Sequence, residues 1–251
     1  MKKFETTIFE PKFATLPTQF DGFCVVHIAD LHNFDYKGAL ELEITKHSPD
    51  IIFITGDSVH HENCYENTLQ LIRTISNVAP VYFVTGNHEG RFKSYPDLRK
   101  QLQDAEAIVL ENESVMLSRD DSQIALIGIH DPKFFENKND FKNELAELVN
   151  LHKDDFKILL SHRPEHFKLY NKMGYDLVFA GHAHGGQVRF PWIGALFAPG
   201  QGLFPKYVNG LCSDGKCNMV VSRGLGQTRK TLPRICNKPE LQIVRLKYDT
   251  N

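Results

Sequence analysis

The ten residues FCVVHIADLH, at positions 23–32, combine a short apolar run with polar side chains at its end. The run 23–29 is apolar at almost every position and is interrupted only by His27. Such a run is typical of a strand whose two faces are both buried. Asp30 and His32 follow at once, so we expect their side chains at the carboxyl end of this strand, where α/β sheets bind ligands.

The same alternation of apolar runs and polar stretches continues along the chain. Further runs predict strands at 51–55, 81–85, 124–129, 157–161, 176–180 and 219–222. The stretches between them predict helices at about 37–47, 64–77, 95–104, 140–152 and 164–173. This order indicates a layered α/β fold, in which buried sheet packs between layers and helices lie outside.

Composition and charge narrow the class of function. Lys and Arg number 29 against 31 Asp and Glu, so the formal net charge of −2 provides no bulk attraction for nucleic acid. No apolar stretch approaches the roughly 20 residues that span a bilayer, and residues 1–13 lack the apolar run of a secretory signal. We therefore expect a cytoplasmic protein that does not bind nucleic acid.

A single domain over residues 1–251 is expected, with one compositional break at about 185–216. This segment is rich in Gly, Pro and aromatic residues and is predicted to be a long ordered excursion. Its aromatic side chains either pack against the core or form an apolar wall or membrane-touching lip. The five cysteines are scattered and odd in number, which favours reduced thiols.

Polar residues that suit metal binding follow most of the predicted strands. Besides Asp30 and His32, they are Asp57, Asn87, His88, His162, His182 and His184. We expect all eight side chains to lie in one crevice at the carboxyl ends of the strands. Carboxylate, imidazole and carboxamide together suit Mn, Fe or Zn, and the set is larger than one ion needs. The pattern therefore predicts two divalent ions that share a carboxylate and activate a water for attack on phosphorus.

Five motifs, HIADLH, TGDSVH, TGNHE, LLSHRPE and AGHAHGGQ, span residues 27–187. They resemble, in order, the signature blocks of the calcineurin-like metallophosphoesterase superfamily. The resemblance implies a layered α/β/β/α sandwich of mixed sheets. It also implies ligands for a first metal ion, namely Asp30, His32 and His184, and for a second, namely Asn87, His162 and His182. Asp57 would bridge the two ions, and His88 would hydrogen-bond the phosphate and protonate the leaving oxygen.

The motifs GHAHGGQ, PWIGALF and SRGLGQT are similar to those of the bacterial branch that includes YkuE-type enzymes and UDP-2,3-diacylglucosamine pyrophosphohydrolases. The resemblance implies hydrolysis of a phosphodiester or pyrophosphate bond by metal-bound hydroxide, with Mn²⁺ as the expected ion and Fe or Zn as alternatives. The substrate would be a small-molecule or lipid-linked phosphoester. The N-terminus departs from that branch because it lacks a membrane anchor or twin-arginine signal, and contact with the inner face of the membrane would then be peripheral.

Two other functions stay open at this stage. A phosphomonoesterase would use the same ions, and a non-catalytic metal-binding scaffold would use the same fold, as a retromer subunit of this fold does. A scaffold would have little reason to keep all eight positions, His88 included. The oligomeric state is not predicted.

Further polar residues near these motifs have two interpretations each. Arg163 is a candidate substrate-binding residue because its guanidinium matches a phosphate, with a structural ion pair as the alternative. The pair His60 and His61 follows Asp57 closely; a solvated loop is predicted for it, with contact to the site or substrate as the alternative. An anion-receptive rim or solvated surface is predicted for Arg223, Arg229 and Lys230.

Overall fold

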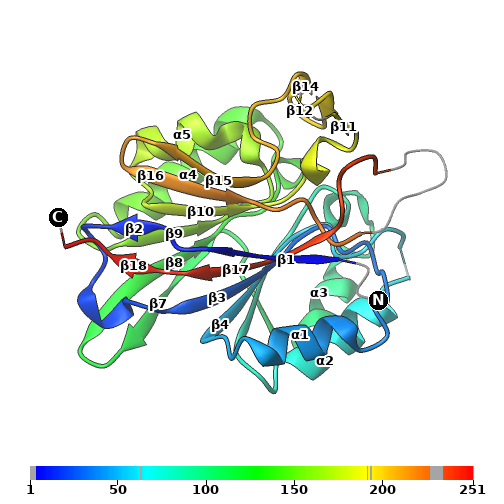
Figure 1. Ribbon diagram of the computed structural model, residues 1–251, viewed down its shortest axis with the longest axis horizontal. Coiled ribbons are helices and arrows are strands. Elements are labelled where there is room, and N and C mark those ends of the chain that lie inside the picture. The colour runs from blue at the N-terminus through cyan, green and yellow to red at the C-terminus, as the bar shows by residue number, and fades with distance from the viewer. Residues whose placement is uncertain (1–3, 63, 191, 193, 227–233, 251) are drawn as a thin grey trace.

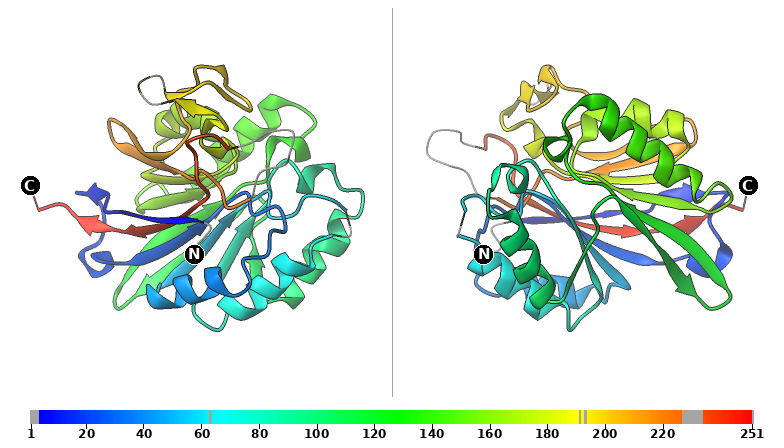
Figure 2. Two further views of the ribbon diagram at one scale, coloured as in Figure 1. Left: turned by 45° about the vertical axis from the view of Figure 1, so that its right-hand side comes forward. Right: turned by 180° about the vertical axis from the view of Figure 1, so that it is seen from behind.

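Two six-stranded sheets lie face to face in the computed structural model, with helices on both outer sides (Figure 1). The structure describes residues 4–62, 64–190, 192, 194–226 and 234–250. Figure 2 shows the same layering from two further directions. The predicted α/β/β/α sandwich of mixed sheets is therefore confirmed.

The first sheet contains, in spatial order, β1 (Glu5–Phe9), β17 (Glu240–Arg245), β3 (Cys24–Ile28), β4 (Ile51–Thr55), β5 (Val81–Val84) and β6 (Ala107–Val109). Strands β3 to β6 are parallel, whereas β17 runs antiparallel to β3. The outer side of this sheet is covered by α1 (Ala39–Lys46), α2 (Glu66–Ile75) and α3 (Tyr95–Asp104).

The second sheet contains β15 (Gly210–Asp214), β16 (Cys217–Val221), β10 (Leu177–Ala180), β9 (Lys157–Leu160), β8 (Ser122–Gly128) and β7 (Glu113–Arg119). Its four inner strands are parallel, and each edge strand runs antiparallel to its neighbour. Its outer side is covered by α4 (Lys138–Asn150) and α5 (Phe167–Met173).

Strict alternation of side chains divides the apolar residues among three cores. In β4, Ile52 and Ile54 pack under the helices, whereas Ile51 and Phe53 face the other sheet. Successive side chains of a strand point to opposite faces, so a strand buried on both faces must be apolar throughout. The seven predicted strands are all of this kind, and all seven are present.

His27 is the one polar residue in the apolar run 23–29, and it lies buried between the sheets. Its Nδ1–H donates to Oε1 of Gln242, and Nε2 accepts from Oγ1 of Thr55, each at 2.8 Å. Burial lowers the pKa of His27 to about 4, so the ring is neutral at pH 7. The histidine is a satisfied core residue rather than a ligand.

Shorter elements complete the chain. One two-stranded sheet joins β2 (Lys12–Phe13) to β18 (Lys247–Tyr248). Within the predicted excursion, two hairpins are formed by β11 (Arg189–Phe190), β12 (Gly194–Ala195), β13 (Phe197–Ala198) and β14 (Gly202–Leu203). Single 3-10 turns are η1 (Thr18–Phe20), η2 (Glu89–Arg91), η3 (Pro132–Phe134), η4 (Pro164–His166) and η5 (His184–Gly186).

Towards the end of this segment, Gly210–Asp214 belong to the second sheet as β15. All five cysteines carry free thiols, as expected. In the part of the chain that the structure describes, no helix has the length and apolarity to cross a bilayer. The single-domain organisation stays a prediction.

Candidate metal centre

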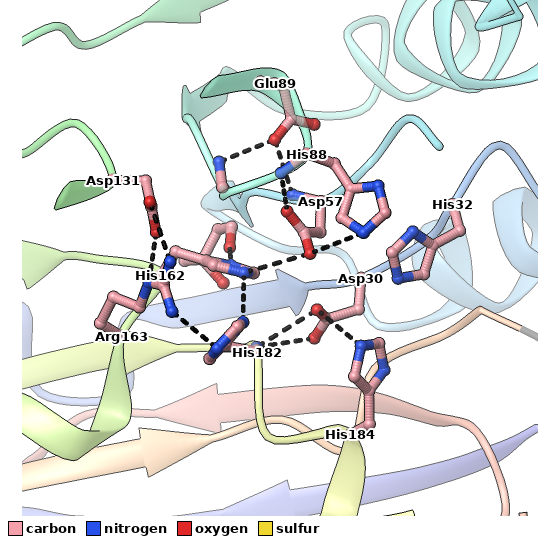
Figure 3. A network of polar contacts seen from close by, with 12 residues as sticks. Asp30, His32, Asp57, His88, Glu89, Asp131, His162, Arg163, His182 and His184 are labelled. Atoms are coloured by element: carbon pink, nitrogen blue, oxygen red, sulfur yellow. Dashed lines mark hydrogen bonds and ion pairs between the residues drawn. The ribbon is translucent and has the colours of Figure 1, made fainter. Parts of the chain in front are cut away.

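The carboxyl ends of five parallel strands, three from one sheet and two from the other, place the predicted site residues together (Figure 3). Four donor side chains form a first cluster, Asp30, His32, Asp57 and His184. A second cluster contains Asp57, His162 and His182. Within each cluster, one donor atom from every residue lies within 4.8 Å of the others. Asp57 belongs to both clusters.

Asn87 lies beside these clusters and lines the same pocket as Asp57. Its Oδ1 atom is buried and finds no hydrogen-bond partner among the residues that the structure describes. A buried acceptor without a partner costs about 1–3 kcal/mol, so the arrangement suits a cation at this position. The carboxamide thus fits the metal-ligand set that the sequence predicts.

The loops that carry the donors have an unusual backbone. Five of the seven predicted ligands have a positive φ, between 47° and 64°: Asp30, His32, Asp57, His182 and His184. Non-glycine residues seldom adopt this region, and such strain is typical of functional sites. The loops also approach one another closely, because a Cβ atom on Gly86 would lie 2.3 Å from Oδ1 of Asp57. Only glycine therefore fits at position 86 without moving these loops.

The buried carboxylate of Asp57 is held by nearby positive charge. The backbone N–H of His88 donates to its Oδ1 at 2.8 Å, and Nε2 of His162 lies 3.3 Å from its Oδ2. Burial raises the pKa of Asp57, but the charge and hydrogen bond of His162 outweigh this and hold it well below its usual value. Burial likewise lowers the pKa of His162, and Asp57 reverses this, raising it to about 10. The imidazole of His162 and the backbone N–H of His88 are therefore the partners of this buried carboxylate.

The other three imidazoles are held neutral. Burial, followed by the charges of neighbouring histidines, lowers the pKa of His32 and of His182. Burial also lowers the pKa of His184, although Asp30 opposes it. Neutral imidazole is the form that binds metal ions. His162 is also oriented for this role, because its Nδ1–H donates to the carbonyl of Thr55 at 2.7 Å and leaves Nε2 facing Asp57.

Glu89 ties together the two loops that carry Asp57 and Asn87. Its fully buried carboxylate accepts backbone N–H groups of Gly86 at 2.7 Å, Asp57 at 3.0 Å, Ser58 at 3.0 Å and Val59 at 3.3 Å. Burial and the charge of Asp57 raise the pKa of Glu89 to about 7. The carboxylate is therefore a positioning group for the loops and lies outside both donor clusters.

Arg163 is fixed in place by a buried acidic partner. Its Nε and Nη2 donate to the two carboxylate oxygens of Asp131, and its Nη1 lies 2.7 Å from Nε2 of His182. The guanidinium also lines the pocket beside the clusters. A structural ion pair is thus present, and the same side chain still borders the space where a ligand would bind.

The pocket has a volume of about 330 Å³ and a cationic wall. Two exposed cations that sequence reasoning did not single out, Arg91 and Lys133, line it together with Arg163. His88 also lines it, and its Nδ1–H donates to the carbonyl of His60 at 3.3 Å. A space bordered by histidines and cations is suited to an anionic ligand.

A family model described as calcineurin-like phosphoesterase matches residues 24–186, which include all of these loops. This chain is a calcineurin-like phosphoesterase. The family comprises metal-dependent phosphohydrolases that use divalent ions, and the two clusters offer side chains that could bind them.

Curated relatives agree with this membership. The phosphoesterase is 29% identical over 252 residues to the Bacillus subtilis protein named uncharacterized metallophosphoesterase YkuE, covering 97% of this chain and 85% of the relative. It is 27% identical over 235 residues to the Escherichia coli phosphodiesterase YaeI, covering 89% and 82%. It is 32% identical over 162 residues to the Chlamydia muridarum UDP-2,3-diacylglucosamine pyrophosphatase LpxG, covering 61% and 46%.

The fold has solved counterparts as well. The structure of phosphopantetheinyl hydrolase from Mycobacterium tuberculosis superposes with a TM-score of 0.52 at 10% identity, covering 82% of this chain and 90% of that one. At this identity the likeness concerns the fold alone. It agrees with the two-sheet sandwich of the phosphoesterase.

His60 lies beside the predicted site residues, which was the less favoured of its two interpretations. Its ring is half-buried, with Nδ1 3.3 Å from Nδ1 of His32 and its centroid 4.7 Å from that of His88. The expected solvated loop is correct only for the exposed His61. The sequence signal was the position of His60, three residues after Asp57, in a loop that folds back over the phosphoesterase site.

The predicted cationic rim is not formed by Arg223. This side chain pairs with Glu5 at 2.9 Å and with Glu240 at 3.0 Å, and so joins β1 to β17. Arg229 and Lys230 lie outside the described residues.

Replacing Glu89 tests its positioning role. Glu89→Ala leaves four buried N–H groups without their acceptor, so the free energy of unfolding should fall by at least about 3 kcal/mol in urea titrations. Glu89→Gln retains one acceptor oxygen and should lose less. Glu66→Ala, which removes an exposed pair with Arg73, should change stability by less than about 0.5 kcal/mol. Equal losses for the variants at 66 and 89 would contradict the role.

Adjacent histidines provide a matched test of the His60 contact. His60→Ala removes the imidazole that contacts His32 and His88, and turnover of a phosphoester should fall about tenfold, the scale on which groups behind a metal ligand act. His61→Ala should leave turnover unchanged. Steady-state rates of the two metal-replete variants decide the matter, and identical rates would place His60 outside the working site.

Proposed function

We propose that this phosphoesterase hydrolyses a phosphodiester or pyrophosphate bond at a dinuclear metal centre. The observation that carries the proposal is the sharing of Asp57 between two donor clusters. A carboxylate common to two sets of imidazoles is what a pair of ions about 3.5–4 Å apart requires. One cluster alone would support only a single ion.

The proposed ligand sets follow the clusters. Asp30, His32 and His184 would hold one ion. His162, His182 and Asn87 would hold the other, and Asp57 would serve both. The mixture of carboxylate, imidazole and carboxamide favours a borderline divalent ion, with Mn²⁺ proposed first and Fe or Zn as alternatives. Bound there, the two ions would polarise the phosphoryl group and lower the pKa of a water molecule.

The side chains around the clusters have separate proposed tasks. Arg91, Lys133 and Arg163 attract and orient the anionic phosphoester, and Asp131 keeps the guanidinium of Arg163 aimed at the pocket. Nδ1–H of His88 donates to a backbone carbonyl, so Nε2 is the nitrogen that would face the phosphate; in the imidazolium form it would donate its proton to the leaving oxygen and become neutral. Nε2 lies 3.8 Å from Oδ2 of Asp57, which places it at the edge of the centre.

The type of phosphoester is the finer part of the proposal. The relative YaeI is named a phosphodiesterase, and LpxG is named a pyrophosphatase of UDP-2,3-diacylglucosamine. These names favour a phosphate group that is substituted on both sides, as in a diester or a pyrophosphate. A lipid-linked or UDP-sugar substrate is accordingly included. A phosphomonoesterase is the second candidate, because the same ions and the same cationic wall suit a terminal phosphate.

Metal content and a substrate panel test the proposed centre together. Protein expressed with ample Mn²⁺ should carry about two equivalents per chain by elemental analysis, since two ligand sets are present. Asp57→Asn should lose most of both equivalents, whereas Asp35→Asn, outside the clusters, should retain them. The panel covers a phosphomonoester, a phosphodiester, nucleoside cyclic phosphates and UDP-linked acylated sugars.

Hydrolysis of the diester or pyrophosphate in preference to the monoester supports the proposed bond type. Preference for the monoester would replace it with the second candidate. Near-zero metal content in the Mn²⁺-grown protein would overturn the dinuclear centre itself.

Replacing His88 separates proton transfer from metal binding. His88→Ala should lower kcat by about 100-fold, the lower end of what a positioned general acid contributes. The metal content should stay at the wild-type value, because the proposal gives His88 no ion. Elemental analysis beside steady-state kinetics measures both quantities, and loss of both ions from this variant would make His88 a ligand instead.

A further inference from the structure

Exposed apolar side chains are concentrated on the two hairpins that follow η5. The hairpins stand outside the four layers, at the end of the molecule opposite α1 (Figure 1, Figure 2). Their exposed large apolar residues, here called the apolar lip, are Phe190, Trp192, Phe197, Leu203 and Phe204. Trp192 is fully exposed, and Leu203 and Phe204 are 74% and 69% exposed.

This concentration differs from ordinary surface apolar residues. Elsewhere in the described chain, exposed residues such as Leu42 on α1 and Leu151 after α4 stand on separate elements. Isolated exposed apolar residues are normal, whereas several in contact mark an interaction surface. The five members of the lip lie within fifteen consecutive residues, 190–204.

The charge around the lip has one sign. Residues 177–213 contain no Asp or Glu, although the chain has 31 such residues. Lys206 is exposed two residues after Phe204, with its Nζ 5.1 Å from the centroid of the Tyr207 ring. The second cation, Arg189, donates to Gly185 and Asn209 and stabilises the base of the hairpins.

The lip also borders the pocket. Pro199 and Gly200, in the turn between β13 and β14, line the same space as His88 and Arg163. The nearest carboxylate to this turn is Glu165, which packs on Gly200 and pairs with Arg163 at 3.5 Å. A surface that bound the lip would therefore lie beside the mouth of the pocket.

We propose that the apolar lip docks this protein onto an anionic bilayer surface. Trp192, Leu203 and Phe204 enter the boundary between headgroups and acyl chains, where aromatic side chains gather in membrane proteins. Lys206 lies at the level of the lipid phosphates, and no carboxylate of the segment opposes it. The two hairpins project from the molecule, and projecting apolar side chains fit a deformable lipid surface better than they fit a closely packed groove on a protein partner. The docking requires neither metal ions nor catalysis.

Trp192 provides a direct probe because it is the only tryptophan in the chain. The full-length protein is mixed with vesicles of phosphatidylcholine, with or without phosphatidylglycerol. Docking should shift the tryptophan emission to shorter wavelength with the anionic vesicles, and lipids brominated on their acyl chains should quench it. Cosedimentation measures the partition coefficient independently of fluorescence.

Matched variants assign the contact to the lip. Leu203→Ser should weaken partitioning about tenfold, as expected for one buried apolar side chain. Leu42→Ser alters a leucine of nearly equal exposure, 75%, on α1, a helix that lies away from the hairpins (Figure 1), and should change nothing. Lys206→Gln should weaken binding about fivefold on anionic vesicles and leave binding to neutral vesicles unaltered. Both serine variants alter exposed side chains, and circular dichroism checks their folding.

Three results would overturn the proposal. The first is the absence of a blue shift and of cosedimentation at the highest lipid concentration. The second is equal weakening by Leu203→Ser and Leu42→Ser. The third is a change of oligomeric state on Leu203→Ser with vesicle binding unaffected, because the lip would then be an interface between copies of the chain. Metal-free and metal-replete protein should bind vesicles equally, so this test stands apart from that of the proposed function.

Discussion

The burial of the Asp57 carboxylate is the constraint on which the centre depends. A charged carboxylate removed from water is costly unless positive charge lies against it. In this protein the partner is His162, whose pKa rises to about 10 beside Asp57 while the neighbouring imidazoles stay neutral. The fold therefore maintains a buried carboxylate that needs positive charge against it.

Contacts between the two sheets hold the side chains around Asp57 in place. Asp30 comes from the first sheet and accepts the backbone N–H of His182, at 3.0 Å, from the second. In the opposite direction, His162 donates to the carbonyl of Thr55. Each sheet thus orients a donor of the other, and the sandwich packing is part of the geometry of the centre. Glu89 adds the same control within one sheet, by fixing the loops after β4 and β5 through four backbone groups.

The sequence predicts the central strands and the donor side chains because both leave a local pattern. Strands buried on two faces appear as unbroken apolar runs, and the donors follow them directly. The strands that were not predicted lack an unbroken apolar run. In β17, ELQIVR, the polar Gln242 is buried inside the sheet, where it pairs with His27, 215 positions away in the sequence. The specific contacts of His60 and Asp131 were not predicted for the same reason, since their partners His32 and Arg163 are distant in sequence. Glu89 stands inside a recognised motif, but its role depends on N–H groups that only the folded loops bring together.

The place of β17 in the first sheet has a consequence for the order of folding during synthesis. This strand lies between β1 and β3 and is made of residues 240–245, so the sheet that carries Asp30 and Asp57 lacks an inner strand until they have been translated. The backbone around Asp30 is also bound by late residues, because Leu225 and Gly226 donate to the carbonyls of Ala29 and Asp30. The second sheet contains no comparably late strand. The loops of the first sheet that carry the predicted ligands are therefore framed by a strand that is made late, and we expect the candidate centre to be completed only after residues 240–245 have joined the sheet.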